Sequence, residues 1–238
     1  MITKEQFKKN VEMVRENLSR FSREITIVAV TKTWPAEIYE LCREEELTHI
    51  GENRVQEIRE KADIAKKWNL QVHLIGPLQE NKIKYLPGKI QSFDALSSEK
   101  IATKLAKRFQ EKDESLSVLI QINSTGEKNK SGILAEDEHV LYSLIESVLK
   151  QPSLQLEGFM TIGPTPSGNY NIKDKQYQRD TRFAFEKTRL LHEKIQSRYK
   201  IKLPRLSMGM SHDYLFAAEM GATEVRLGSI LFGERHAR

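Results

Sequence analysis

A lysine at the end of an apolar strand is a residue that could do covalent chemistry. In the segment ITIVAVTKTWP, β-branched and apolar residues predict a strand buried on both faces, and Lys32 follows it directly. A lysine in this place can pair with a carboxylate, bind a phosphate or attack a carbonyl, and position alone favours the structural ion pair. Burial would lower the pKa of its amine from the ordinary value of about 10.4, which would free the amine for attack.

Two segments near the carboxyl terminus shift this balance, because they predict a phosphate site. The motif SMGMS supplies two hydroxyls, those of Ser207 and Ser211, and the motif RLGS places the backbone N–H groups of Gly228 and Ser229 beside a further hydroxyl. Barrels of alternating strands and helices often place a phosphate cradle after their seventh and eighth strands. Such pairs of glycine and serine also occur in ordinary turns.

Four further residues are candidates for the same site, each with a structural alternative. Arg226 could hold a ring nitrogen or an anionic oxygen, or pair with a glutamate at the barrel rim. Asn53 could hydrogen-bond a ring substituent, or cap the helix that follows it. His73 lies in the middle of a strand, where a lone histidine is more often a satisfied core residue than a functional one. Met208 is a soft side chain suited to a pocket wall or to core filling.

The elements that must position these residues alternate along the whole chain. Strands are expected at residues 25–31, 48–51, 71–75, 92–96, 117–123, 156–161, 205–207 and 224–227, and helices at 36–46, 53–67, 79–85, 99–112, 136–150, 175–199 and 213–219. An extra helix is expected before the first strand, at about residues 4–18, and a long loop at 163–175. Even spacing and the lack of a glycine-rich fingerprint after the first strand favour one α/β domain over residues 1–238, a closed (β/α)8 TIM barrel, over an open doubly wound sheet. Chemistry in such a barrel lies at the carboxyl ends of the strands.

Composition narrows the class of protein. The 38 basic and 33 acidic residues are mixed along the chain, with a net charge of +5 and no basic arm, RNA-binding aromatic signature or zinc spacing, so neither nucleic acid nor metal is expected as a ligand. Cys42 is the single cysteine, which excludes an internal disulfide. No segment approaches the roughly 18 apolar residues of a membrane helix, and the first residues lack the apolar core of a signal peptide. A cytoplasmic protein is predicted.

Seven motifs in chain order carry a resemblance that none of them carries alone. They are VAVTK, HIGENRVQE, HLIGPLQENK, INSTGEKNKSGI, GFMTIGP, LSMGMSHD and VRLGSILFGER. Together they resemble the YggS/PROSC family, the pyridoxal phosphate homeostasis proteins, over about residues 25–235. The resemblance implies a fold-type III barrel, like the amino-terminal domain of alanine racemase, that carries pyridoxal 5′-phosphate (PLP).

The resemblance also implies roles for individual residues. It gives Lys32 as the Schiff-base lysine, Ser207, Gly228 and Ser229 as phosphate-binding residues with Ser211 as a weaker candidate, Arg226 as the arginine facing the pyridine nitrogen, and Asn53 as part of the lining of the cofactor. His73 and Met208 complete the set of candidate cofactor-binding residues.

The sequence departs from the family pattern near these positions. Ser229 stands where threonine is usual and keeps the hydroxyl, whereas His212 replaces a common aspartate, and the bulky Trp34 follows the lysine closely. In the loop after the fifth strand, Lys128 and Lys130 could bind a second anion, although a solvated basic loop is the plainer interpretation.

The sequence therefore predicts a protein that holds PLP as a lysine aldimine and acts as a buffer or carrier in vitamin B6 homeostasis, without dedicated catalysis. Racemisation needs a base on each face of the substrate, and racemases of this fold take the second base from a β-domain for which the barrel leaves no room in 238 residues. Because that domain also mediates dimerisation, a monomer is expected. A guanidinium can only donate, so Arg226 would keep the pyridine nitrogen unprotonated and the ring a poorer electron sink. PLP-dependent apoenzymes are the expected recipients.

Two other functions are compatible with the same residues. A small PLP-dependent amino-acid racemase would exchange the substrate α-hydrogen with solvent. A Schiff-base aldolase acting on a sugar phosphate would also use a barrel lysine and a phosphate cradle, but a lysine after the first strand fits such enzymes poorly.

Overall fold

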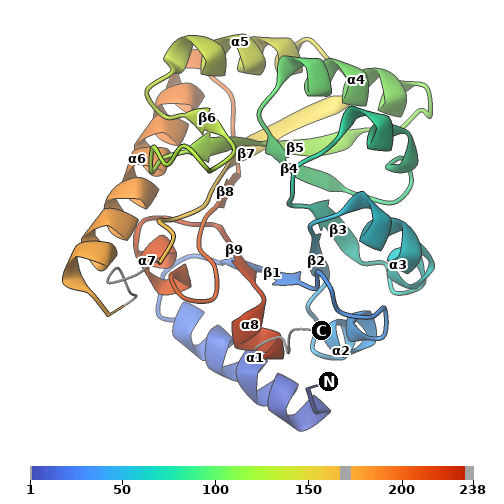
Figure 1. Cartoon of the computed structure of the whole chain (residues 1–238), viewed down its shortest axis with the longest axis vertical. Coiled ribbons are helices and arrows are strands. Elements are labelled where there is room, and N and C mark those ends of the chain that lie inside the picture. Colours follow the sequence, from blue (N-terminus) through green and yellow to red (C-terminus); the bar gives the residue numbers. More distant parts are fainter. Residues whose placement is uncertain (1, 167–172, 234–238) are drawn as a thin grey trace.

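The computed structural model describes residues 2–166 and 173–233, and within these ranges eight parallel strands close into a barrel (Figure 1). Around the ring they are β1 (Thr26–Val30), β2 (His49–Glu52), β3 (Gln71–Leu74), β4 (Ser92–Leu96), β5 (Leu116–Asn123), β7 (Leu154–Thr161), β8 (Arg205–Ser207) and β9 (Glu224–Leu227). Pairing of β4 with β5 and of β1 with β9 leaves no edge between these strands. The predicted (β/α)8 barrel is confirmed, and the open sheet is excluded.

Helices surround the ring and connect its strands (Figure 1). They are α1 (Lys4–Leu18), α2 (Ile38–Glu44), α3 (Val55–Lys67), α4 (Glu99–Gln110), α5 (Glu138–Leu149), α6 (Lys175–Tyr199), α7 (Tyr214–Glu219) and α8 (Ser229–Phe232). The helix expected after β3 is a 3₁₀ helix, η1 (Glu80–Tyr85). The long loop predicted at residues 163–175 lies in part, from 167 to 172, outside the described residues. None of the helices in the described ranges is long and apolar enough to cross a membrane.

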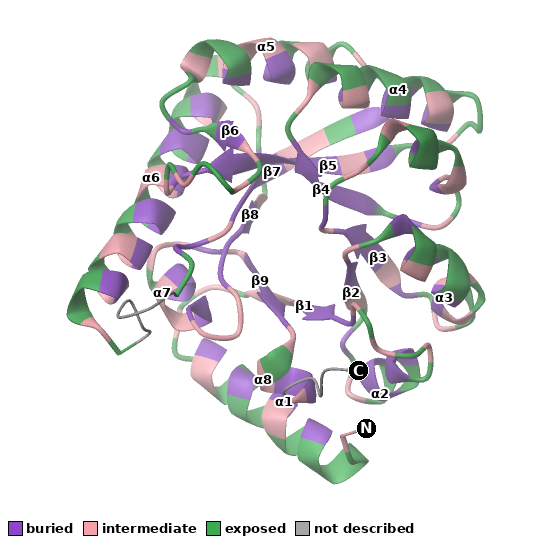
Figure 2. Ribbon diagram, viewed as in Figure 1, coloured by how far each residue is buried: buried purple, intermediate pink, exposed green. Residues whose placement is uncertain are grey.

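Local sequence explains where the longer helices begin. Thr3 caps α1, Ser98 caps α4 and Asp174 caps α6, each with a side-chain oxygen that accepts a backbone N–H from the first turn. Figure 2 shows the strands largely buried and the outward faces of the helices exposed. All five residues of β4 are buried, as expected for a strand covered on both faces.

Two short elements escaped prediction. Strand β6 (Ile133–Leu134) extends the sheet beside β5, and helix α8 follows β9 directly. Neither element is long enough to show a hydrophobic period in the sequence. Each is defined by the segments that pair or pack with it in the fold. Helix α8 matters for function, because it begins inside the RLGS motif.

An aromatic group joins the amino-terminal helix to the end of the chain. The ring of Phe7 on α1 stacks on that of Phe232 on α8 at a centroid distance of 5.2 Å, and the Trp34 ring lies 6.0 Å from Phe232. Asn10 on α1 donates to the carbonyl of Leu231 at 2.9 Å. Helix α1 therefore supports the element that follows the RLGS motif, and Trp34 packs beside it.

A bulge in β7 depends on glycine at position 158. The register between β5 and β7 shifts at this point, and a Cβ on Gly158 would overlap the carbonyl oxygen of Arg205 on β8. We expect Gly158→Ala to lower the free energy of unfolding by about 3 kcal/mol, near the upper range for overpacked sites, because backbone has to move. Urea denaturation measures this, with Gly126→Ala as the control for the positive φ alone: Gly126 has a φ of 71°, but an added Cβ there meets nothing within 4 Å. Equal effects of the two changes would contradict the prediction.

Candidate functional site

Lys32 and Gly228 lie at the same end of the barrel. Lys32 follows β1 in a turn and is partly buried. Strand β9 pairs with β1 in parallel, and Gly228 comes directly after β9, where a Cβ on it would lie 3.5 Å from the carbonyl oxygen of Val30. The carboxyl ends of these two neighbouring strands thus bring together the first and last of the motifs singled out in the sequence.

Arg226 is a buried cation on β9 with two partners in the barrel interior. Its Nη1 donates to Ser207 Oγ at 2.8 Å and its Nη2 to the carbonyl oxygen of Thr161 at 2.7 Å. Burial lowers the pKa of Arg226, although an arginine in a protein keeps its charge. Strands β7, β8 and β9 together fix this guanidinium, and Ser207 is completely buried against it.

The RLGS motif meets the SMGMS motif through one oxygen. Ser211 Oγ accepts the backbone N–H of Gly228 at 3.1 Å and that of Ile230 at 3.2 Å. Two backbone donors therefore converge on a single acceptor position at the barrel mouth. Ser229 lies between them with an exposed side chain, so its hydroxyl is available at the surface of the same turn.

Asn53 and Met208 differ in their surroundings. Asn53 follows β2 and is partly exposed, and it packs against Gly76 so closely that a Cβ there would overlap both its backbone oxygen and its amide side chain. The glycine in the motif HLIGP therefore makes room for Asn53 at the mouth. Met208 directly follows Ser207 and is fully buried in the hydrophobic core.

His73 lies in a different polar cluster. Its Nδ1 is 2.9 Å from Asp94 Oδ2, and its Nε2 is 3.0 Å from Nδ1 of His49, so protein partners engage both ring nitrogens. Arg205, the first residue of β8, and Glu224, the first residue of β9, belong to the same cluster. It therefore lies towards the amino ends of these strands, and His73 is a satisfied core residue there.

The same cluster contains three side chains in a metal-like arrangement. Potential ligand atoms of His73, Asp94 and Glu224 lie within 4.8 Å of one another. Arg205 Nη2 lies between them, 3.0 Å from His73 Nδ1, 3.2 Å from Asp94 Oδ2 and 2.9 Å from Glu224 Oε2. Burial alone would raise the pKa of Asp94, but His73 and Arg205 outweigh it and hold that pKa below its usual range. The guanidinium supplies the positive charge that the carboxylates need.

Two of the residues whose roles the sequence left open, Lys130 and His212, have defined neighbours. Lys130 Nζ donates to the carbonyl of Gly163 at 2.6 Å and pairs with Glu127 at 2.5 Å, so it ties two loops together, while Lys128 is exposed. His212 Nε2 lies 3.6 Å from Asp213 Oδ2. Burial raises the pKa of Asp213.

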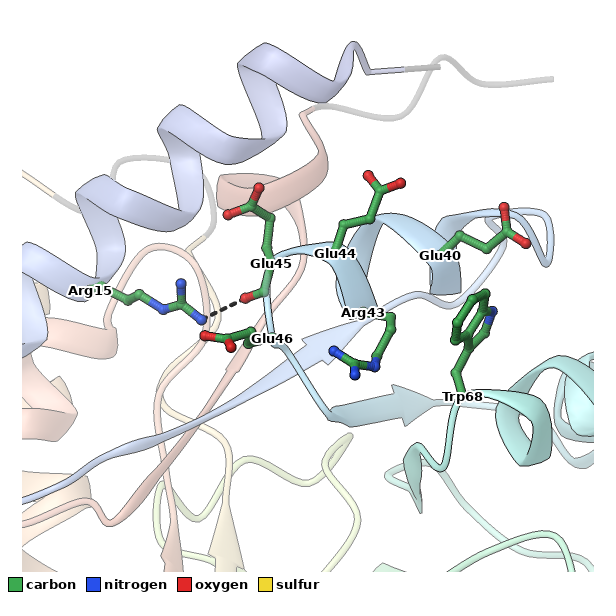
Figure 3. A pocket seen from close by; sticks show the side chains of 7 residues that line it. All are labelled: Arg15, Glu40, Arg43, Glu44, Glu45, Glu46 and Trp68. Atoms are coloured by element: carbon green, nitrogen blue, oxygen red, sulfur yellow. Dashed lines mark hydrogen bonds between the residues drawn. The ribbon is translucent and has the colours of Figure 1, made fainter.

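A cavity of about 470 Å³ lies apart from this site (Figure 3). Its lining is mostly charged and exposed, with Arg15 donating to the carbonyl of Glu45 at 2.6 Å and the Trp68 ring on the other side. It is formed around the end of α2, whereas Lys32 precedes that helix. It contains no lysine and no convergent backbone donors, so it is not a site for a phosphorylated aldehyde.

Comparison with known proteins relates the chain to others of similar length. A family model described as "Alanine racemase, N-terminal domain" matches residues 2–236. The pyridoxal phosphate homeostasis protein of Aquifex aeolicus is 39% identical over 209 residues, covering 88% of this chain and 86% of that protein. The mouse protein of the same name is 34% identical over 242 residues, covering 94% and 84%.

Solved structures agree with this relationship. PipY of Synechococcus elongatus with PLP bound has a TM-score of 0.80 and 26% identity, covering 95% of this chain and all of that one. Alanine racemase of Clostridium difficile has a TM-score of 0.75 at 18% identity and shares the fold over 60% of its length. The chain belongs to the alanine racemase N-terminal domain family, within the pyridoxal phosphate homeostasis proteins.

Proposed function

We propose that this protein binds PLP at the carboxyl end of its barrel, holds it covalently through Lys32, and serves as a PLP buffer or carrier. The observation that carries this proposal is that one end of the barrel, where β1 pairs with β9, brings together Lys32, the buried guanidinium of Arg226 and two backbone N–H donors. The relatives named pyridoxal phosphate homeostasis proteins and the PLP-bound PipY support it.

The groups of PLP match the donors one for one. Its phosphate is an anionic acceptor of the kind on which the N–H groups of Gly228 and Ile230 already converge, with hydroxyls of Ser211 and Ser229 beside them. Its pyridine nitrogen is an acceptor that suits the Arg226 guanidinium. Its aldehyde is the group that a lysine amine binds reversibly, which is the chemistry the cofactor supplies.

The surroundings of the site favour holding the cofactor over catalysis. A ring nitrogen that faces Arg226 stays unprotonated, because the guanidinium offers no proton, and this weakens the ring as an electron sink. His73, the histidine candidate within the barrel, is engaged with Asp94 and His49. We propose that Asn53 and Met208 line the cofactor, and that His73, whose ring nitrogens are engaged by Asp94 and His49, does not contact it.

The proposal extends to the setting in which the protein acts. We place it in the cytoplasm as a monomer, with PLP-dependent apoenzymes as the recipients of the cofactor. The mixed surface charge and the single, buried Cys42 support an intracellular setting. A barrel mouth formed by turns, with Ser229 exposed, is accessible to an incoming amine.

The visible absorption spectrum of the purified protein, before and after borohydride, tests this function. We expect a yellow protein whose colour is lost on reduction, with one pyridoxyl group per chain mapped by mass spectrometry to Lys32. A colourless protein that cannot be reconstituted with PLP would refute the proposal, and a sugar-phosphate ligand would then be tested. Exchange of an amino-acid α-hydrogen with solvent would instead identify a racemase.

A further inference from the structure

A buried charged cluster lies behind the turn that carries Lys32. Lys61 on α3 is 4% exposed, and its Nζ lies 2.7 Å from Oε1 of the fully buried Glu52 at the end of β2. The same carboxylate oxygen accepts the hydroxyl of Thr31 at 2.6 Å and that of Tyr39 at 3.0 Å. An ion pair at this depth is favourable only when further hydrogen bonds offset desolvation. Here these bonds come from the residue that follows β1 and from α2.

The cluster holds the backbone on both sides of Lys32. Lys61 Nζ donates to the carbonyl oxygen of Thr31 at 3.0 Å, and this carbonyl belongs to the peptide group that leads into Lys32. The N–H of Thr33, in the next peptide group, donates to Glu57 Oε2. That carboxylate oxygen lies 3.7 Å from Lys61 Nζ. Both peptide groups that flank Lys32 are therefore bound to two neighbouring side chains of α3.

The conformation of the turn requires such support. Thr33 has a φ of 68°, in the left-handed region that a β-branched residue rarely adopts. Residues held in that region persist only where their surroundings determine them. A cavity of about 390 Å³, lined in part by Thr33, Glu57 and Lys61, lies against this part of the turn. Because this cavity leaves one side of the turn without close packing, the hydrogen bonds to α3 fix the backbone around Thr33.

We infer that Lys61 and Glu57 are positioning residues for Lys32. They bind the two peptide groups on either side of it, and so direct its amine to the place where the PLP aldehyde is held. This inference rests on the proposed function. It predicts that losing these contacts impairs the bond between Lys32 and the aldehyde without weakening the contacts of Arg226 and of the SMGMS and RLGS motifs, which belong to other strands of the barrel.

Two ligands separate these effects. PLP can bond to Lys32, whereas pyridoxamine 5′-phosphate carries an amine in place of the aldehyde and depends on the remaining contacts. Titrations of both ligands compare Glu57→Ala with Glu57→Gln, whose amide oxygen can still accept the Thr33 N–H. We expect Glu57→Ala to weaken PLP binding about tenfold, the effect of one charge-assisted hydrogen bond, and to change pyridoxamine 5′-phosphate binding less than about twofold. Glu57→Gln should retain most of the affinity for PLP.

A second variant examines Lys61 without leaving a buried carboxylate unpaired. The double change Lys61→Met with Glu52→Gln removes both charges together, and it should show the same selective loss of PLP. Equal losses for both ligands, or no loss for either, would overturn the inference, because the cluster would then serve stability alone. Absence of a borohydride-reducible label on Lys32 in the unmodified protein would instead refute the proposed function, and this inference with it.

Discussion

Replacing Lys32 by alanine should abolish the borohydride-reducible pyridoxyl group and weaken PLP binding by more than about tenfold, or about 1.4 kcal/mol. The aldehyde would have no amine to bond, while Arg226 and the N–H groups of Gly228 and Ile230 would remain in place. Binding of pyridoxamine 5′-phosphate should therefore change little. Visible absorbance, mass spectrometry of the reduced protein and titration of both ligands measure these effects.

The matched control for this change is Lys100→Ala. Lys100 lies on α4 with 68% of its side chain exposed, in a surface ion pair with Glu80. Its removal should leave colour, labelling and affinity unaltered. If Lys32→Ala kept a covalent pyridoxyl group at the barrel mouth after gel filtration, the assignment of Lys32 would be wrong.

Replacing Arg205 by methionine should destabilise the protein by about 3–5 kcal/mol, the cost of removing one partner from a buried ion pair. Asp94 is completely buried and the side chain of Glu224 is 3% exposed, so their charges would lose their nearest cation while remaining out of contact with water. Urea denaturation at neutral pH measures the effect. Arg182→Met is the control, because Arg182 and Glu219 form an exposed ion pair that should contribute about 0–1 kcal/mol.

Acid should reduce this difference in stability. In the native protein the pKa of Asp94 is held below its usual value, so its contribution is present above about pH 4 and is lost as the pH falls further. In the Arg205→Met variant burial would raise the pKa of the same carboxyl, and protonation would relieve the cost of the buried charge. The gap in unfolding free energy should thus be smaller at about pH 4 than at about pH 7. A constant gap would show that lost packing, not charge, is responsible.

Much of the fold follows from local sequence. The ranges predicted for β4, β8, β9, α1 and α6 agree with the structure, because apolar runs and capping residues mark their ends. Strand β2 is shifted by one residue and β7 begins two residues before its predicted start, because hydrogen bonds to neighbouring strands decide these boundaries. Helix α8 and strand β6 depend on contacts between segments distant in sequence. Hydrophobic periodicity gives no information about such contacts.

The candidate site was less accessible to sequence reasoning. Lys61 is a charged residue on a helix, and charged residues on helices usually face solvent. Its spacing from Ile58 and Ala65 nevertheless places it on the buried face of α3, which is the signal that could have identified it. Its partner Glu52 lies on a different element, and only the closed barrel brings the two together. The group around Arg205 was unpredictable for the same reason.

The pairing of β1 with β9 has a consequence for folding. Lys32 and Gly228 are separated in sequence by nearly the whole barrel, so the two halves of the proposed PLP site meet only when β9 pairs with β1 and completes the ring. Contacts between segments so distant in sequence form late in folding, because closing the long intervening chain is entropically costly. A ligand that contacts residues at the ends of both β1 and β9 binds the closed barrel and not a partly folded chain. Occupancy of the site therefore marks a chain whose barrel has closed, and the ligand stabilises the contact that closes it.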